Sequence, residues 1–249
     1  MNSHLLVKTK NVERGLECLS YILSRPVAHQ VGMGMIYGRP GLGKTQFSMR
    51  YAIENDCVYF SALKASTPKS FTVELLRKLR ERYEPGNAAH IVGSKARLFR
   101  EILDTINKNT TKLHMPLILI DEVDNIIHYP HEEIIGMLRD IADNTVAGVV
   151  LIGMQDLREK VMKLNSHYYN RFIYFAEFKP LSDADVVMMC KSLAEIDIAE
   201  DLARFTNEKA QAGGDARKVI KAIRLYEDIA AKVNLKALDL ATYSKVVGR

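Results

Sequence analysis

The chain has 249 residues, of which 47% are hydrophobic and 26% charged, and its formal net charge is +5. This length suits one large or two modest α/β domains, and the composition is that of a globular protein without long low-complexity segments. No run of about 18 apolar residues occurs, which excludes a membrane-spanning helix, and the polar N-terminus excludes a secretory signal. The three cysteines form no CxxC pair, so we expect reduced thiols in a cytoplasmic protein.

Apolar residues recur at helical or strand-like spacing through the first half of the chain. The helical spacing predicts helices over residues 11–24, 45–54, 71–83 and 95–107. Short apolar runs predict strands over residues 33–37 and 57–62. Strands and helices therefore alternate from the N-terminus onward.

The same alternation continues to residue 179. Residues 116–121 form an unmixed apolar run that ends in an acid, which is typical of a central parallel strand buried on both faces. A helix is expected over 134–143, and further strands over 146–152 and 172–178. This order indicates a doubly wound, parallel five-stranded sheet in an α/β domain that covers residues 1–179.

The pattern changes after Pro180. Helical spacing without a clear strand covers residues 183–195, 199–211, 215–232 and 238–247. We therefore expect a domain boundary near Pro180 and a small all-helical lid domain over residues 180–249.

A glycine-rich loop separates the first predicted strand from the second predicted helix. Residues 38–45 match the pattern GxxxxGK[ST] in full. The glycines let backbone N–H groups turn toward phosphate oxygens, and the following helix adds the positive end of its dipole. Lys44 supplies a charge for the β- and γ-phosphates, and the Thr45 hydroxyl is placed to ligate Mg²⁺. The sequence therefore predicts a site for ATP and Mg²⁺ that comprises Gly38, Arg39, Pro40, Gly41, Leu42, Gly43, Lys44, Thr45 and Gln46.

A second motif ends the apolar run of residues 117–120 in two acids. Asp121 lies at the predicted tip of the strand, where a carboxylate can hold the Mg²⁺ shell. Glu122 follows it and can orient or deprotonate an attacking water. The alternative is a pair of acids that caps the next helix. The histidine-containing turn at 128–131 has no third ligand at metal-binding spacing, so we interpret it as a solvated turn.

These motifs resemble those of AAA+ ATPases, and the resemblance extends over residues 10–249. It implies an arginine finger at Arg171, which would reach the γ-phosphate of a neighbouring subunit, and a sensor-2 arginine at Arg217. Structural or surface ion pairs are the alternative for both. The family places a polar sensor-1 residue at the tip of the fourth strand, where this chain has Met154 and Gln155. Because only Gln155 can orient a water, and only if the register shifts by one residue, we expect slow hydrolysis.

Within the AAA+ class, the chain resembles transposition regulators of the MuB, TniB and TnsC type. The resemblance rests on residues 36–45, 117–126, 149–157, 170–172 and 213–223. It implies an ATP-dependent homo-oligomer, either a ring or a helical filament, that coats or encircles double-stranded DNA. Such an assembly would select a target and stimulate a transposase.

The charge distribution is the feature that points to DNA. Residues 61–112 contain 11 Lys and Arg against 5 Asp and Glu, an excess that attracts phosphates. The candidate contacts, each on a loop or near a helix start, are Lys64, Lys69, Lys95, Arg97 and Arg100. A solvated helix face is the alternative interpretation of each of them.

Two other functions stay open. One is a helicase loader or initiator-like ATPase that remodels another protein on DNA, although no winged-helix pattern follows the lid. The other is a nucleotide-switched, protein-remodelling module without a role on DNA. The basic stretch favours a DNA function, and the unusual sensor 1 favours a slow switch over a processive motor.

Overall fold

The computed structural model describes residues 5–26, 30–88, 90–111, 114–127, 132–208 and 213–248. The turn at 128–131 lies outside the described residues. The chain divides into two compact units. Unit 1 comprises the described residues of 1–14, 39–43 and 178–249, and unit 2 comprises those of 15–38 and 44–177. A functional division of the chain near Pro180 stays a prediction.

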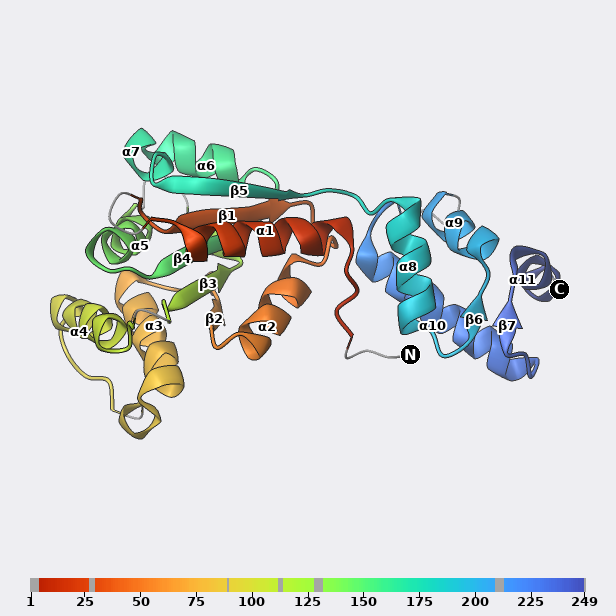
Figure 1. Cartoon of the computed structure of the whole chain (residues 1–249), viewed down its shortest axis with the longest axis horizontal. Helices are drawn as coiled ribbons and strands as arrows, with labels where there is room; N and C mark the ends of the chain where they lie inside the picture. Colours follow the sequence, from red (N-terminus) through yellow and green to blue (C-terminus); the bar gives the residue numbers. More distant parts are fainter. Residues whose placement is uncertain are drawn as a thin grey trace. The chain divides into compact units, whose positions relative to one another are not determined.

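Unit 2 is built on a five-stranded parallel sheet with the strand order β2-β3-β4-β1-β5 (Figure 1). The strands are β1 (Met33–Gly38), β2 (Val58–Ser61), β3 (Leu117–Asp121), β4 (Gly148–Gly153) and β5 (Phe172–Phe178). The register pairs Ile120 with Leu151 and Tyr37 with Gly153. The carboxyl ends of β1, β3 and β4 therefore meet at one edge of the sheet, which is where open parallel sheets bind ligands.

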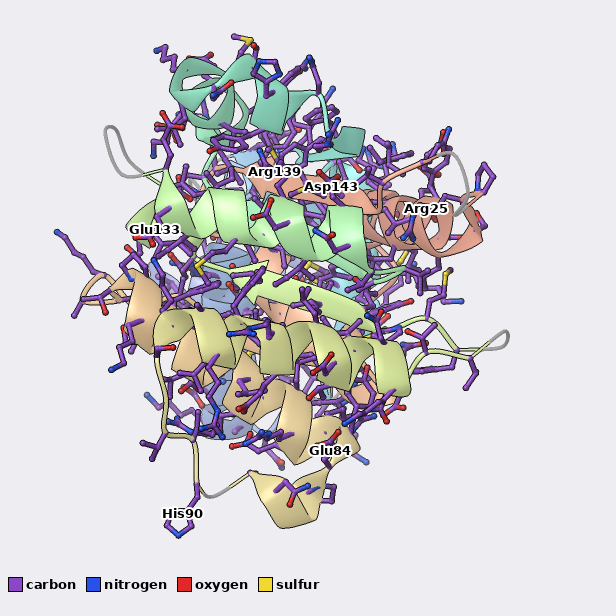
Figure 2. All side chains as sticks on the ribbon, turned by 90° about the vertical axis from the view of Figure 1, so that its left-hand side faces the viewer. Arg25, Glu84, His90, Glu133, Arg139 and Asp143 are labelled. Atoms are coloured by element: carbon purple, nitrogen blue, oxygen red, sulfur yellow. The ribbon has the colours of Figure 1, made fainter. Side chains whose placement is uncertain are left out.

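Helices cover both faces of this sheet. They are α1 (Lys10–Ser24), α2 (Lys44–Glu54), α3 (Pro68–Tyr83), α4 (Lys95–Lys108), α5 (Glu133–Asn144), α6 (Leu157–Leu164) and α7 (Ser166–Tyr169). Two short 3-10 turns, η1 (Pro85–Asn87) and η2 (Val123–Asn125), follow α3 and β3. Figure 2 shows α3, α4 and α5 on the side of unit 2 that faces the viewer, and α3 packs against both of the others.

The two faces follow from the alternation of side chains along the strands. Met33 and Met35 of β1 belong to the core that the buried residues of α3, α4 and α5 complete. Gly34, between them, faces the opposite side of the sheet. A side chain there would collide with Ile22 of α1, so α1 lies against that face. The predicted doubly wound α/β fold is confirmed, and α6 and α7 are additions that the sequence patterns did not predict.

Unit 1 contains the helical part that follows β5. Its helices are α8 (Asp183–Leu193), α9 (Glu200–Glu208), α10 (Ala216–Lys232) and α11 (Leu240–Val247). Their buried faces enclose Tyr226, whose hydroxyl shares a hydrogen bond of 2.7 Å with that of Thr206. Two-residue strands β6 (Asp197–Ile198) and β7 (Ala237–Leu238) also pair in parallel. Strands this short carry no periodicity, so the sequence predicted only the helices.

Across the described ranges, none of the helices combines the length and the apolar character that crossing a bilayer requires.

Candidate active site

The phosphate loop connects β1 to α2 and has the backbone that its glycines predict. Gly41 and Gly43 adopt φ angles of 84° and 89°, in the left-handed region that other residues rarely enter. A Cβ atom built on Gly43 would meet no heavy atom within 4 Å, so a ligand can approach the loop closely there. The loop is therefore open at Gly43, whereas a Cβ on Gly41 would meet the carboxylate of Asp215.

Lys44 begins α2 directly after the loop. Its side chain is buried, and its Nζ donates a hydrogen bond of 2.7 Å to the carbonyl oxygen of Gly38. The ammonium is thus held against the loop, where bound phosphates would replace part of its lost hydration. Thr45 and Gln46 are exposed in the first turn of α2, next to the positive end of the helix dipole.

Asp121 ends β3 with a carboxylate that is almost completely buried, at 2% exposure. Its oxygens accept hydrogen bonds from the Tyr59 hydroxyl at 3.1 Å and from the Glu122 backbone N–H at 2.8 Å. Burial and the adjacent negative charge of Asp121 raise the pKa of Tyr59, so its hydroxyl stays protonated and donates. Sequence reasoning missed Tyr59, because its role depends on the pairing of β2 with β3.

Glu122 lies immediately beyond β3 and adopts an unusual backbone. Its φ of 55° and ψ of 33° are left-handed, a conformation that typically costs a non-glycine residue about 1–3 kcal/mol. Strained backbone of this kind gathers at functional sites. The turn leaves the Glu122 side chain exposed, whereas Asp121 beside it is buried.

These residues fit a nucleotide with its Mg²⁺. Asp121 and Thr45 offer a carboxylate and a hydroxyl oxygen, the donor types that Mg²⁺ prefers. Lys44 and the loop offer positive charge and backbone donors for phosphates. The assignment of individual roles to these residues stays a prediction.

The turn that follows β4 contains Met154 and Gln155, the residues at the expected position of sensor 1. Gln155 is exposed, and Met154 donates its backbone N–H to Oδ2 of Asp124 at 2.6 Å. Asp124 belongs to η2, so it links the turn after β3 to the turn after β4. Sequence reasoning did not single out Asp124, and the sensor-1 role of Gln155 stays a prediction.

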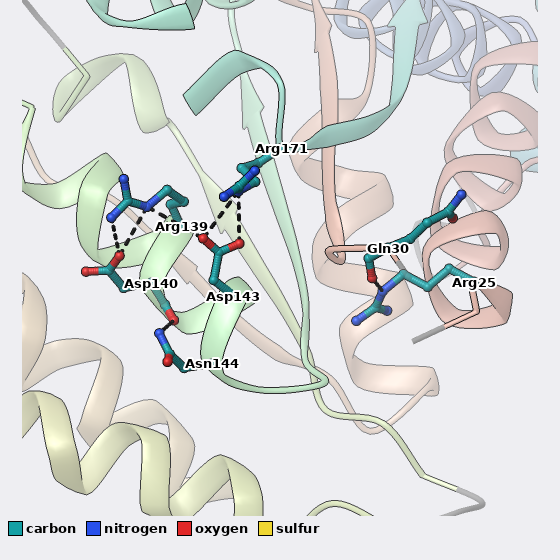
Figure 3. Close-up of polar contacts among 7 residues, drawn as sticks. All are labelled: Arg25, Gln30, Arg139, Asp140, Asp143, Asn144 and Arg171. Atoms are coloured by element: carbon teal, nitrogen blue, oxygen red, sulfur yellow. Dashed lines mark hydrogen bonds and ion pairs between the residues drawn. The ribbon is translucent and has the colours of Figure 1, made fainter. Parts of the chain in front are cut away.

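Arg171 lies at the start of β5 and is engaged within its own chain. Its Nε is 3.0 Å from an oxygen of Asp143, near the end of α5, and 43% of its side chain is exposed. Figure 3 shows Arg171 at the Asp143 carboxylate, whereas Arg139 pairs with Asp140 and makes only a longer contact of 3.8 Å with Asp143. The structure thus shows an intramolecular ion pair at Arg171, and the arginine-finger role stays a prediction.

Arg217 lies at the start of α10, within unit 1. Asp215 caps this helix by accepting the backbone N–H of Arg217 at 2.8 Å. The residue before Arg217, Ala216, donates its backbone N–H to the carbonyl oxygen of Gly41 at 2.9 Å. The Arg217 side chain is exposed, and its sensor-2 role stays a prediction.

The five candidate DNA contacts are exposed but differ in their surroundings. Lys95 pairs with Glu133 at the start of α5, and Arg97 pairs with Glu101 on its own helix. Arg100 donates to the Ala96 carbonyl at 3.4 Å. Lys69 lines a groove of about 890 Å³ between β2 and α3, and Lys64 lies in the loop that precedes this helix.

The sequence matches the family model of the AAA domain over residues 27–161. A comparison with curated proteins found no match. The structure is similar to the ORC2 protein of Aeropyrum pernix in its ADPNP-ADP complexes, with 15% identity and a TM-score of 0.70, over 100% of this chain and 69% of that one.

Two further structures are similar over nearly all of this chain. The ORC1 protein of A. pernix in complex with DNA has 14% identity and a TM-score of 0.63, over 98% of this chain and 66% of that one. Cdc6p of Pyrobaculum aerophilum has 16% identity and a TM-score of 0.66, over 95% and 66%. The chain spans about two thirds of the length of these proteins, and likeness at this identity shows the fold. Because the family match spans more than half of the chain and contains both the phosphate loop and the acidic end of β3, this protein belongs to the AAA domain family and is an AAA+ ATPase.

Proposed function

We propose that this chain is an ATP-switched subunit of an oligomer on double-stranded DNA, acting in the manner of an initiator or helicase loader. One observation carries the proposal: a complete phosphate loop and acidic strand end lie in a fold that resembles initiator structures over nearly the whole chain. One of those initiator proteins was solved in complex with DNA. The chain spans only about two thirds of that protein, so the DNA role rests on the five exposed candidate contacts described above.

The chemistry follows from the residues around the loop. Lys44 would bind the β- and γ-phosphates, and Thr45 and Asp121 would hold Mg²⁺, whose charge would offset that of the phosphates. Glu122 accepts a proton from water as the water oxygen attacks the γ-phosphorus, and the bond to the β–γ bridging oxygen breaks to give ADP and phosphate. The exposed position of Glu122 supports this role, because a water can reach its carboxylate.

Assembly would place Arg171 against the nucleotide of a neighbouring subunit. Its partner in the single chain, Asp143, forms a partly exposed ion pair, and such pairs contribute about 0–1 kcal/mol. Exchange of this carboxylate for a γ-phosphate is therefore energetically easy. An arginine supplied by a neighbour makes hydrolysis depend on assembly.

A transposition regulator is the second candidate function. It is supported by the motifs shared with proteins of the MuB, TniB and TnsC type, and the structural resemblance to initiators favours the first candidate. The two differ in the protein partner. A transposase would bind the ATP-bound assembly in the second case, and a replicative helicase or its loader in the first.

DNA binding by Lys64 and Lys69, the candidate contacts next to and in the groove at α3, tests the proposal. We would measure fluorescence anisotropy of a labelled duplex at several salt concentrations, with a non-hydrolysable ATP analogue or with ADP. Binding should require the analogue, and the double variant Lys64→Glu, Lys69→Glu should bind less tightly with a smaller salt dependence. Each phosphate contact contributes about 0.9 to the slope of log K against log salt, so two lost contacts lower its magnitude by about 2.

Arg82→Glu is the matched control, because Arg82 is exposed at the end of α3 and pairs with Asp56. It should bind DNA almost as tightly as the unaltered chain. Absence of duplex binding at low salt with either nucleotide would sink the DNA proposal and favour a protein-remodelling ATPase.

A further inference from the structure

We propose that Asp124 is a positioning residue for ATP hydrolysis, which deepens the proposed function and rests on the ATPase site described above. It holds the turn after β4, which carries Gln155, against the turn after β3, which carries Glu122. Asp124 would not touch the nucleotide. It would act by fixing the distance between two turns that face the same γ-phosphate.

The contacts of Asp124 lie on both sides of its carboxylate. Oδ2 accepts the backbone N–H of Met154 at 2.6 Å, and Oδ1 accepts the Nζ of Lys160 at 2.8 Å. The Asp124 side chain is only 13% exposed. Hydrogen bonds to a charged acceptor in such a partly buried place are roughly twice as strong as neutral ones. One side chain from η2 therefore anchors both the end of β4 and the helix α6 that follows.

The approach of Asp124 to β4 also explains the last residue of that strand. A Cβ built on Gly153 would lie 2.4 Å from Oδ2 of Asp124, so a side chain at this position and the observed carboxylate are incompatible. The same Cβ would lie 2.9 Å from Leu157. Gly153 is thus a consequence of the close contact between the two turns.

Lys160 completes the network. Its Nζ also lies 3.1 Å from Asp156, in the same turn as Gln155. Burial acts to lower the pKa of Lys160, and the hydrogen bonds to Asp124 and Asp156 outweigh it, so the pKa is raised and the side chain stays charged. Lys160 consequently connects Asp124 to the turn after β4 at a second point, beyond the Met154 N–H.

The register of the sheet explains why this network affects chemistry. β3 and β4 are parallel neighbours, so their ends meet at one edge of the sheet, and Glu122 lies two residues before Asp124. Met154 has no polar side chain to orient a water, so Gln155 is the side chain of this turn that could do so, and the contact of the Met154 N–H with Asp124 helps to hold the turn in place. A misplacement of about 1 Å at a reacting centre can cost up to about 100-fold in rate.

The test is steady-state ATP hydrolysis by Asp124→Ala, Asp124→Asn and Lys160→Met, with ADP affinity and the urea unfolding curve measured alongside. For Asp124→Ala we expect kcat to fall between about tenfold and 100-fold, with KM for ATP and the Kd for ADP within about twofold of the unaltered chain. Asp124→Asn keeps an acceptor for Met154 and should recover part of kcat. Lys160→Met removes the hydrogen bond from Lys160 to Asp124 and should lower kcat by several-fold. Asp104→Ala, an exposed acid on α4, is the control and should change nothing.

Glu122→Gln in the same assay separates this inference from the site assignment. If Glu122→Gln abolishes hydrolysis and Asp124→Ala retains the full kcat, Asp124 is not a positioning residue. If Glu122→Gln also hydrolyses normally, the assignment of the catalytic base is itself wrong. If Asp124→Ala does not fold, Lys160→Met decides, and an unchanged kcat in that variant overturns the proposal.

Discussion

Substitution of Tyr59, in β2, by Phe removes the hydroxyl that donates to Asp121 and keeps the aromatic ring. A hydrogen bond to a charged group contributes about 1.5–3 kcal/mol to stability. Asp121 keeps its second bond, from the Glu122 N–H, so we expect the lower part of this range, about 1.5–2 kcal/mol, for the ligand-free chain. This corresponds to about a 10- to 30-fold increase in the unfolding constant.

The assay is urea unfolding followed by circular dichroism, with and without Mg²⁺ and a non-hydrolysable ATP analogue. If Asp121 binds Mg²⁺, the cation offsets the lost donor, and the difference between Tyr59→Phe and the unaltered chain should shrink to less than about 1 kcal/mol. Tyr21→Phe is the control, because Tyr21 is 44% exposed. A Tyr59→Phe variant as stable as this control would refute the importance of the Tyr59–Asp121 contact. A difference that the metal and nucleotide leave unchanged would refute Asp121 as a ligand.

Three further predictions follow from the site and the core. Lys44→Ala should lose ATP binding in calorimetric titrations while its unfolding curve stays cooperative, and wild-type affinity would contradict the phosphate-loop assignment. Arg171→Ala should bind ATP as a monomer and fail to assemble in sedimentation velocity. Normal ATP-dependent assembly of this variant would show that Arg171 is not an arginine finger. Burial raises the pKa of the Cys18 thiol from its ordinary 9.0 to about 12, so the unfolded chain loses this proton first. The stability that Cys18 contributes should be complete below pH 9 and fall by about 1.4 kcal/mol per pH unit above it, and Cys18→Ala should flatten the fall in urea titrations from pH 9 to 11.

The parts of the site that the sequence predicted are those encoded in short, contiguous patterns. The phosphate loop needs glycines at fixed offsets before a lysine, and β3 needs four apolar residues before an acid, so both were visible without the fold. The contacts that complete the site join residues far apart in sequence. Tyr59 and Asp121 are 62 residues apart, and Asp124 and Lys160 are 36 apart, so their meeting depends on the strand order.

Two differences concern local structure. The helix α6 was missed although Leu157, Val161 and Leu164 are buried at helical spacing, because the helix has only eight residues. The functional interpretation of Arg171 depended on a resemblance. The single chain shows an ion pair between Arg171 and Asp143, which a local sequence pattern could not predict. An arginine finger acts on a neighbouring subunit, so a single chain is expected to hold that side chain in another contact.

Electron microscopy of the purified chain with double-stranded DNA tests the central claim most directly. Samples would contain a non-hydrolysable ATP analogue or ADP, with Lys44→Ala as the matched control. We predict rings or filaments on DNA with the analogue, and none with ADP or with Lys44→Ala. Assemblies that form equally well with ADP, or a chain that never associates with DNA at low salt, would contradict the account of an ATP-switched ATPase that assembles on DNA.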